Sequence, residues 1–310
     1  MKLSTIEAFK HIRSRDAIEL TSDQLEQLQK TLNGMLFDIV DCCERHGIRY
    51  SLGGGSCLGA VRHHGFIPWD DDIDLNMPRR DHDRFVKIFA KEYGDRYWVH
   101  TARTTKNYGL LLSRVLLKGT SVRTREDFWN KECGAFVDIF IIENTYDDPL
   151  LRKIHGFGCM ALGFLQSCRK FYRDRKPLRK LLRDAGDSRQ IREYRKAFEV
   201  KIAIGFLVSF LSMDAWTHLV DSWYGRCKNE HSRYVSVPSG RGHFFGELYL
   251  RKDFVRTVPM TYEGRPLQVA KNYDGYLRRL YGDYRKIPKK SRQEKHVFFA
   301  PFYLKKEEDS

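Results

Sequence analysis

The chain has 310 residues, which is enough for one large domain or two small ones. Apolar residues make up 42% of it and aromatic residues 13%, so it can bury a substantial core and does not have a disordered composition. The formal net charge of +15 favours an anionic partner such as nucleic acid, an acidic membrane surface or a phosphorylated substrate. A soluble basic protein without such a partner can carry the same charge.

Seven cysteines are scattered along the chain, with Cys42 and Cys43 adjacent. Their number is odd and no C-x-x-C occurs, which favours reduced thiols over a disulfide framework or a zinc site. Residues 1–16 are charged throughout and lack the apolar run of a signal peptide. We therefore expect a cytoplasmic protein, with peripheral contact to the inner face of a membrane left open.

The first long element is a predicted helix over residues 21–46. Thr21 and Gln24 suit a capping box at its start, and Gly47 supplies a stop. Between them, apolar residues recur at helical spacing: Leu25, Leu28, Leu32, Met35, Leu36, Ile39 and Cys43. A short strand over residues 48–52 then leads into three consecutive glycines.

Helices and strands alternate irregularly up to residue 149. Residues 56–64 and 81–93 are predicted helices, and the strands are predicted at residues 72–77, 97–102, 109–117 and 134–143. This mixture indicates an α/β or α+β catalytic core over residues 1–149. Residues 231–310 return to strand-like alternation, end in a helix near residues 273–288, and are expected to complete the core.

Residues 150–230 differ in composition. From Arg169 to Lys196 there are 12 Lys/Arg against 4 Asp/Glu, a net of +8. Apolar stretches at residues 154–168 and 202–213 flank this segment, each shorter than the roughly 20 residues of a bilayer span. Two interpretations stay open: a basic amphipathic helical surface that meets an anionic membrane or acidic acceptor, or a helical pair packed on the core with a solvated basic face.

The stretch from Gly53 to Pro78 carries an acidic cluster. Four carboxylates fall within five positions: Asp70, Asp71, Asp72 and Asp74. An EF-hand loop is excluded, because its glycine and glutamate positions hold Met77 and Asp83. A glycosidase pair is weakly supported, because the alternation of Asp72 and Asp74 along a strand puts them on one face.

A magnesium site for phosphoryl transfer fits this stretch best. Same-face carboxylates of Asp72 and Asp74 can share hard cations through oxygen. Upstream, Gly55 and Ser56 would hold a phosphate at the positive end of the helix that begins there. Asp138, an isolated charge in a predicted core strand, is a candidate third ligand for a two-metal clamp, with a paired structural carboxylate as its alternative.

The quoted residues also carry a resemblance. The block GGGSCLGAVRHHGFIPWDDDIDLNMPRRDHDRF, residues 53–85, resembles the signature of the LicD family, which includes relatives of fukutin-related protein. Residues 134–143 and 273–288 resemble later family segments in the expected order, and residues 233–250 do so more loosely. The resemblance spans about residues 20–290 and rests chiefly on its first, specific block.

This resemblance implies a nucleotidyltransferase-like fold: a mixed sheet core, flanking helices and a basic helical insertion, in the α+β class. It implies Mg2+-dependent transfer of phosphocholine, or a related phospho-alcohol, from a CDP-activated donor to a glycan hydroxyl, with CMP leaving. The family pattern matches Gly54, Gly55 and Ser56 to the phosphate turn. Arg62 then meets the donor's phosphates, and the metal ligands are Asp72, Asp74 and Asp138.

Some neighbouring roles stay open. Asp138 is one choice for the base that takes the acceptor's proton. Trp69 could stack on cytosine or face choline's quaternary ammonium, but a core role is the commoner one for such a residue. Asp70 and Asp71 either touch metal or pair with nearby arginines. Family relatives carry a histidine pair near the carboxyl end, where this chain has His296 followed by Val297.

Two rival functions fit parts of the sequence. A nucleotidyltransferase acting on nucleic acid would suit the net charge, but the excess is concentrated in one segment and no RNA-binding motif is present, so no nucleic-acid partner is expected. A non-catalytic glycan- or membrane-binding protein on the same fold would have lost its metal ligands, whereas all three candidates are present.

Overall fold

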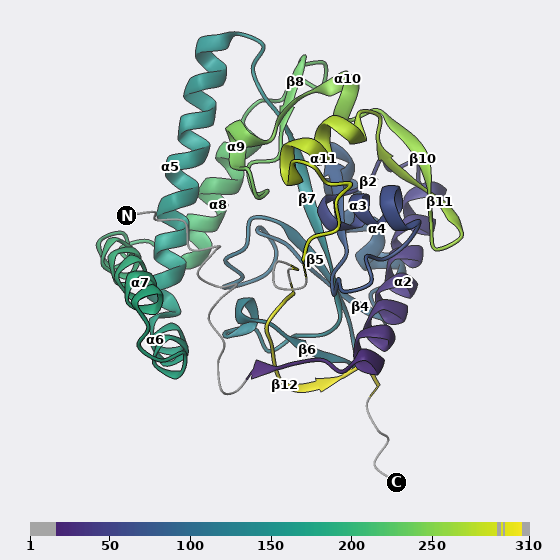
Figure 1. Cartoon of the computed structure of the whole chain (residues 1–310). Coiled ribbons are helices and arrows are strands. Elements are labelled where there is room, and N and C mark those ends of the chain that lie inside the picture. The colour runs from purple at the N-terminus through teal and green to yellow at the C-terminus, as the bar shows by residue number, and fades with distance from the viewer. Residues whose placement is uncertain (1–16, 290–292, 294, 306–310) are drawn as a thin grey trace.

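A computed structural model describes residues 17–289, 293 and 295–305. Residues 1–16, on which the expectation about a signal peptide rests, lie outside the described residues. The structure is of the α+β class, with helices around a mixed, curled sheet (Figure 1). The expected fold class is therefore confirmed.

The main sheet has the strand order β2-β3-β7-β5-β4, and β8 and β9 extend it from the end of β7. Strands β3 and β7 are parallel, and the other pairs are antiparallel. The strands are β2 (Ser51–Leu52), β3 (Asp74–Pro78), β4 (Tyr97–His100), β5 (Ser113–Leu117), β7 (Phe136–Asn144), β8 (Tyr234–Ser236) and β9 (Leu248–Leu250).

Two smaller sheets bring distant parts of the chain together. Strands β10 (Thr257–Tyr262) and β11 (Arg265–Ala270) form a hairpin. Strand β12 (Phe298–Tyr303) pairs with both β1 (Ala17–Ile18) and β6 (Ser121–Arg123). The carboxyl-terminal part of the described chain is thereby fastened to its amino-terminal half.

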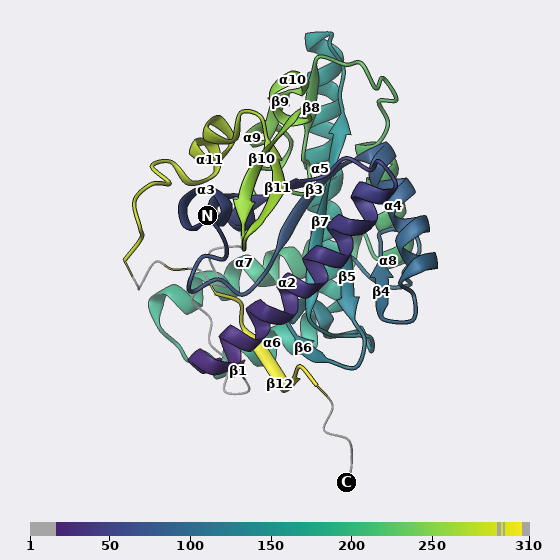
Figure 2. The same ribbon diagram turned by 90° about the vertical axis from the view of Figure 1, so that its right-hand side faces the viewer.

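Helix α2 (Ser22–Arg45) shows how the local sequence selects the fold. Thr21 caps it in the predicted capping box with Gln24. Its predicted apolar face is buried from Leu28 to Cys43. Burying this stripe removes apolar surface from water at about 25 cal/mol per Å². Together with α4 (Arg79–Glu92), this helix covers one face of the main sheet (Figure 2).

The basic segment is helical, as expected, and lies beside the sheet as a separate layer (Figure 1). It comprises α5 (Pro149–Arg173), α6 (Arg175–Asp184), α7 (Arg189–Leu207) and α8 (Met213–Tyr224). Leu178, Leu182 and Phe198 help to form a small apolar core inside it. Within the described chain, no helix combines the length and the apolar character that crossing a membrane requires.

Four shorter helices complete the structure: α3 (Gly54–His63), α9 (His243–Gly246), α10 (Arg251–Phe254) and α11 (Tyr273–Tyr281), with a 3-10 turn at Arg125–Asp127. The strand predicted over residues 48–52 is present only at Ser51–Leu52. The strand predicted from residue 72 begins at Asp74. Helix α3 begins at Gly54, so the glycine run itself forms the first turn of the helix.

A buried ion network joins the helical layer to the sheet. Arg79, at the start of α4, donates to Glu143 of β7 through Nε and Nη2, and to the Asp221 carboxylate of α8 at 2.8 Å. Both carboxylates are almost completely buried. Arg103 also donates to Asp221, at 2.5 Å. A guanidinium between two buried carboxylates is costly to remove, because each would remain charged without its partner.

Substitution of Arg79 therefore has a clear expected outcome. Arg79→Met should lower the free energy of unfolding by about 3–5 kcal/mol, because it leaves Glu143 without its guanidinium and Asp221 with Arg103 alone. The control is Arg80→Met on the exposed side of α4, which should change it by less than about 0.5 kcal/mol. Urea unfolding followed by circular dichroism measures both. Equal stability of the two variants would contradict the assigned role of the network.

Candidate active site

One cavity of about 600 Å³ collects the acidic residues that the sequence singles out, and we call it the acidic cavity. Gly54 and Gly55 form part of its wall. The carboxylates on the wall are Asp70, Asp71, Asp72, Asp74, Asp138, Glu126, Glu247 and Asp283. Strand β5, helix α11 and the segment around His296 close it from other parts of the chain. Segments far apart in sequence therefore converge on one site.

Strand register brings two of the predicted metal ligands together. Asp74 and Asp138 are direct neighbours on the parallel strands β3 and β7. Ile73, just before β3, is fully buried, and its carbonyl accepts from the Asp138 N–H at 2.9 Å. Asp72 and Asp74 flank this buried residue, so both side chains face away from the core and line the cavity. The three predicted carboxylates thus share one cavity.

The glycine turn is packed directly against the carboxylates. Gly54 has a φ of +40°, and a Cβ atom there would lie 2.5 Å from Asp74 Oδ2. A Cβ on Gly55 would lie 2.7 Å from Asp70 Oδ2. With glycine at both positions, these oxygens lie against the first turn of α3, where the helix dipole favours negative charge, and a side chain there would displace them. The expectation placed a phosphate here; the structure places two carboxylates beside the same turn.

Gly54 and Ser56 of this turn form hydrogen bonds with other residues of the protein. The Gly54 N–H donates to the Tyr276 hydroxyl oxygen at 2.8 Å. Ser56 is buried, and its Oγ accepts from the Asp74 N–H at 2.9 Å. The Ser56 side chain is not part of the cavity wall. Its hydroxyl therefore fixes the start of β3, and its contact with a donor phosphate stays a prediction.

Crowding shifts the acid–base properties of the cluster. Burial raises the pKa of Asp72 to about 6, Asp71 and Asp138 add to the rise, and His296 opposes it. Burial and the neighbouring carboxylates hold the pKa values of Asp70 and Asp74 well above the usual range of aspartate. Upward pKa shifts are expected for carboxyl groups that are buried and close to other carboxylates. A divalent cation would relieve this repulsion.

One cationic group already approaches the cluster. The Asp71 carboxylate accepts from the His296 backbone N–H at 2.9 Å and contacts its Nδ1 at 2.7 Å. His296 Nδ1 also lies 3.8 Å from Asp72 Oδ2. Although burial lowers the pKa of His296, Asp71 and Asp72 raise it to about 10, so the ring is an imidazolium near neutral pH. Asp71 thus pairs with a histidine from the carboxyl-terminal segment.

Asp138 is paired with an arginine. Arg114, its cross-strand partner on β5, donates to Asp138 Oδ1 from Nε at 2.7 Å and to Oδ2 from Nη2 at 3.0 Å. Both side chains are largely buried, and Arg114 also lies over the Phe136 ring at 3.8 Å. Asp138 is therefore a paired carboxylate in this structure, which was the alternative to a metal role.

Arg62 and Trp69 stand together at another part of the cavity wall. The Arg62 guanidinium lies 5.8 Å from the centre of the Trp69 ring and donates to the Tyr284 carbonyl at 2.7 Å. Trp69 is half-buried and packs against the main core. Both residues line the cavity, so both can reach a bound molecule. Their predicted contacts with a donor stay predictions.

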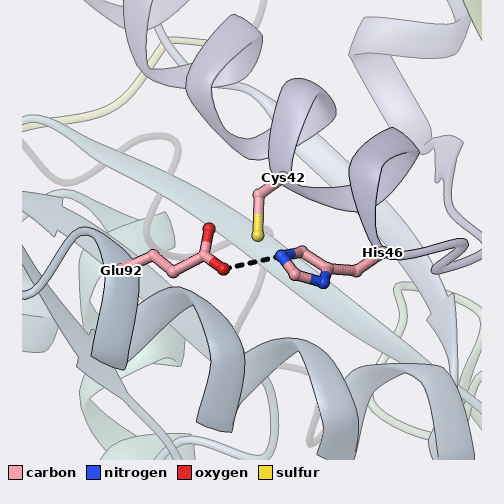
Figure 3. A group of neighbouring side chains, drawn as sticks. All are labelled: Cys42, His46 and Glu92. Carbon is pink, nitrogen blue, oxygen red and sulfur yellow. Dashed lines mark hydrogen bonds and ion pairs between the residues drawn. The ribbon is translucent and has the colours of Figure 1, made fainter.

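Two compact sets of potential metal ligands occur among the described residues, one in the acidic cavity and one outside it. Carboxylate and imidazole atoms of Asp71, Asp72 and His296 lie within 4.8 Å of one another. Among the described residues, the trio Asp72, Asp74 and Asp138 does not form so compact a set. A second compact set, Cys42, His46 and Glu92, joins α2 to α4 and is not part of the acidic cavity (Figure 3).

The second set is accounted for by protein contacts. His46 Nε2 lies 2.6 Å from Glu92 Oε1 (Figure 3). Arg45 Nη2 donates to Oε2 of the same carboxylate at 2.8 Å. Burial raises the pKa of the Cys42 thiol to about 11, which keeps it protonated. All seven cysteines are buried and none forms a disulfide. This cluster therefore fastens the end of α2 to the end of α4.

Sequence reasoning named some residues of the site without giving them a role in it. His296 was noted only as a departure from the family pattern, and Tyr276 and Tyr281 lie in the family-like segment 273–288, yet all three line the cavity from about 200 positions beyond Asp70–Asp74. Arg114 sits in an apolar predicted strand opposite the isolated Asp138. That pair of complementary charges in neighbouring strands was the one available signal.

Comparison with known proteins points in one direction. The family model described as "LicD/FKTN/FKRP, nucleotidyltransferase domain" matches residues 47–152. Over 268 residues the chain is 30% identical to lipopolysaccharide cholinephosphotransferase LicD of Haemophilus influenzae, covering 84% of this chain and 91% of that relative. It is also 51% identical over 56 residues to ribitol 5-phosphate transferase FKRP of Homo sapiens, covering 18% of this chain and 11% of that protein.

The tight glycine turn can be tested by stability. Gly54→Ala should lower the free energy of unfolding by about 1–3 kcal/mol, because the new Cβ meets the Asp74 carboxylate and the positive φ is strained. Gly34→Ala on α2 is the control, since a Cβ atom there would meet no other atom within 4 Å, and it should raise stability by about 0.5–1 kcal/mol. Urea unfolding gives both values. An unchanged free energy of unfolding in Gly54→Ala would show that the turn can accommodate a Cβ atom at this position.

Proposed function

The chain belongs to the LicD family, and on that premise we propose that it transfers a phospho-alcohol from a CDP-activated donor to a hydroxyl of a cell-surface glycan. Phosphocholine is the favoured group. The relative that is similar over most of the chain is a cholinephosphotransferase, whereas the ribitol 5-phosphate transferase matches a short stretch only. The single observation that carries the proposal is the convergence of Asp72, Asp74 and Asp138 on one cavity beside a glycine turn.

The donor set suits magnesium. Hard oxygen ligands are what Mg2+ prefers, and burial together with the neighbouring carboxylates raises the pKa values of Asp72 and Asp74, so a bound cation would favour their ionised forms. Arg114 occupies one lone pair on each oxygen of Asp138, and a carboxylate has about four such sites, so Asp138 can still serve as a third ligand. Bound magnesium, in our proposal two ions, would neutralise the donor's diphosphate and acidify the acceptor hydroxyl.

The protein's own groups would then act by position and charge. The acceptor oxygen attacks the phosphorus that bears the alcohol, and CMP leaves. Arg62 and Gly55 both line the cavity, and in our proposal Arg62 contacts the donor's phosphates. Proton transfer to Asp138 would compete with its ion pair to Arg114, which makes Asp138 a constrained choice of base.

Aromatic residues support choline as the transferred alcohol. Trp69, Phe140, Tyr276 and Tyr281 share the cavity wall with the carboxylates. Aromatic faces attract quaternary ammonium groups, and choline would bind a ring other than Trp69 unless the Arg62 guanidinium beside Trp69 moved towards the donor's phosphates. The most informative assay is incubation with magnesium and a panel of CDP-alcohols, scoring CMP release with and without candidate acceptors. CMP release from none of them would overturn the proposal.

Removing one carboxylate should separate activity from stability. Asp72→Asn and Asp74→Asn should each lower turnover roughly 100-fold or more, because both act through charge on the metal. Without metal, each variant should be at least as stable as the wild type, because mutual repulsion is relieved. The exposed Asp95→Asn is the control and should leave both turnover and stability unchanged.

The same assay tests the cofactor. Chelation with EDTA should abolish CMP release, and added Mg2+ should restore it. Full turnover of Asp72→Asn or Asp74→Asn, or turnover that survives chelation, would remove the metal assignment while leaving the fold assignment intact.

We also propose that the protein works at the inner face of a membrane, through the helical layer. Three large apolar side chains at the end of α7 and in the loop before α8 are strongly exposed. Their exposed fractions are 60% for Phe206, 72% for Leu207 and 77% for Phe210. Basic groups lie close by, since Arg175 stacks on Tyr172 at 4.2 Å and Tyr172 contacts Phe206. Exposed apolar residues beside basic ones suit an anionic lipid surface.

This membrane contact has its own test. The triple substitution F206S/L207S/F210S should weaken binding to vesicles containing phosphatidylglycerol, because the apolar contribution is lost. W129S/I287S removes exposed apolar groups elsewhere and should bind as the wild type does. Deleting residues 169–196 is a poorer test, since Leu178 and Leu182 are core residues of the helical layer. Equal binding of the triple variant, measured by co-sedimentation, would refute the contact.

A further inference from the structure

A second cavity, of about 770 Å³, lies away from the acidic cavity and shares no lining residue with it. We call it the basic cavity. Its described lining has one acid, Glu230, and six cationic residues: Arg49, Arg80, Arg233, Arg251, Lys252 and Arg256. They come from the α2–β2 turn, from α4, from the residue before β8, and from α10 and the turn that follows it. Folding thus concentrates positive charge from four segments in one concave site.

Arg251 is the most firmly placed of these cations. Its Nε donates to the Ser232 carbonyl at 2.6 Å, and its Nη2 donates to Asn144 Oδ1 at 2.5 Å and to Ser232 Oγ at 2.9 Å. All of these acceptors are neutral, so the guanidinium is oriented without being neutralised. Burial lowers the pKa of Arg251, with Glu230 opposing this effect and Arg49 reinforcing it.

Few acidic groups neutralise the cationic side chains of the basic cavity. Glu230 accepts from Asn144 Nδ2 at 2.9 Å, and Arg49 is paired with Asp81 at 2.7 Å. Within the described part of the chain, the side chains of Arg80, Lys252 and Arg256 have no hydrogen-bond or ion-pair partner. Cationic side chains gathered in one concave site attract an anion, which several of them can contact together.

We propose that the basic cavity binds the phosphate group of a second ligand, distinct from the nucleotide donor. Guanidinium groups match phosphate oxygens in pairs of hydrogen bonds, and the volume lies within the range of small-molecule sites. The phosphate can belong to a free phosphoester or to a lipid headgroup at the membrane surface. This proposal does not depend on the transfer reaction proposed for the acidic cavity.

Binding of inorganic pyrophosphate to the full chain, in EDTA and at low salt, tests the proposal by titration calorimetry. EDTA removes metal-dependent binding in the acidic cavity. The triple substitution R80S/K252S/R256S should weaken pyrophosphate binding at least about tenfold, since each lost ionic contact is worth on the order of one such factor. All three side chains are exposed, so the variant should keep the melting temperature of the wild type.

The matched control is K87S/K91S/K106S, which removes the same charge from exposed positions outside the cavity and should bind pyrophosphate within about twofold of the wild type. A parallel arm compares vesicles of phosphatidic acid and of phosphatidylcholine. Loss of vesicle binding alone in the cavity variant identifies a lipid phosphate, and loss of pyrophosphate binding identifies a free one. Equal binding by the wild type and the cavity variant in both arms, or an equal loss in the control, would overturn the proposal.

Discussion

The contact between two carboxylates and the first turn of α3 is the constraint on which the rest of the acidic cavity depends. Any side chain on Gly54 or Gly55 would occupy the space of the Asp74 or Asp70 oxygens. Because the turn is fixed by Tyr276 and by the hydroxyl of Ser56, the start of β3 is fixed with it. Register then carries Asp138 to the side of Asp74. The glycine turn, the start of β3 and Asp138 are therefore held side by side by these hydrogen bonds and by strand register.

Both buried acidic residues of strand β7 are paired with arginines. Asp138 receives two hydrogen bonds from Arg114, and Glu143, at the far end of the same strand, is paired with Arg79. Asp70, Asp72 and Asp74 have no such arginine among the ion pairs of the described residues, and His296 lies 3.8 Å from Asp72 Oδ2. Burial first, and the neighbouring carboxylates after it, raise the pKa values of these three aspartates. The contrast with Asp138 and Glu143 is the feature on which the proposed cation site rests.

The sequence predicted the parts of this arrangement that local pattern encodes. The capping box at Thr21, the apolar stripe of α2 and the glycine–aspartate block are short-range signals, and each appears where expected. The partners of the carboxylates are not local: His296 meets Asp71 across 225 positions, and Arg114 meets Asp138 through β-sheet register. Charge spacing along the chain could suggest that Asp138 needs a partner, but only tertiary structure decides which residue supplies it.

The two cavities stand at opposite ends of one short strand. Asp74 begins β3 and Arg80 follows its end, and a strand of this length spans roughly 16 Å at about 3.3 Å per residue. A single diphosphate cannot reach both the carboxylates of one cavity and the arginines of the other. Arg79, between them, is fixed in the buried network that joins β7 to α8, so the separation is rigid. The ligand that we propose for the basic cavity is therefore a different group from the donor that we propose for the aspartates, and the two proposals can be tested separately.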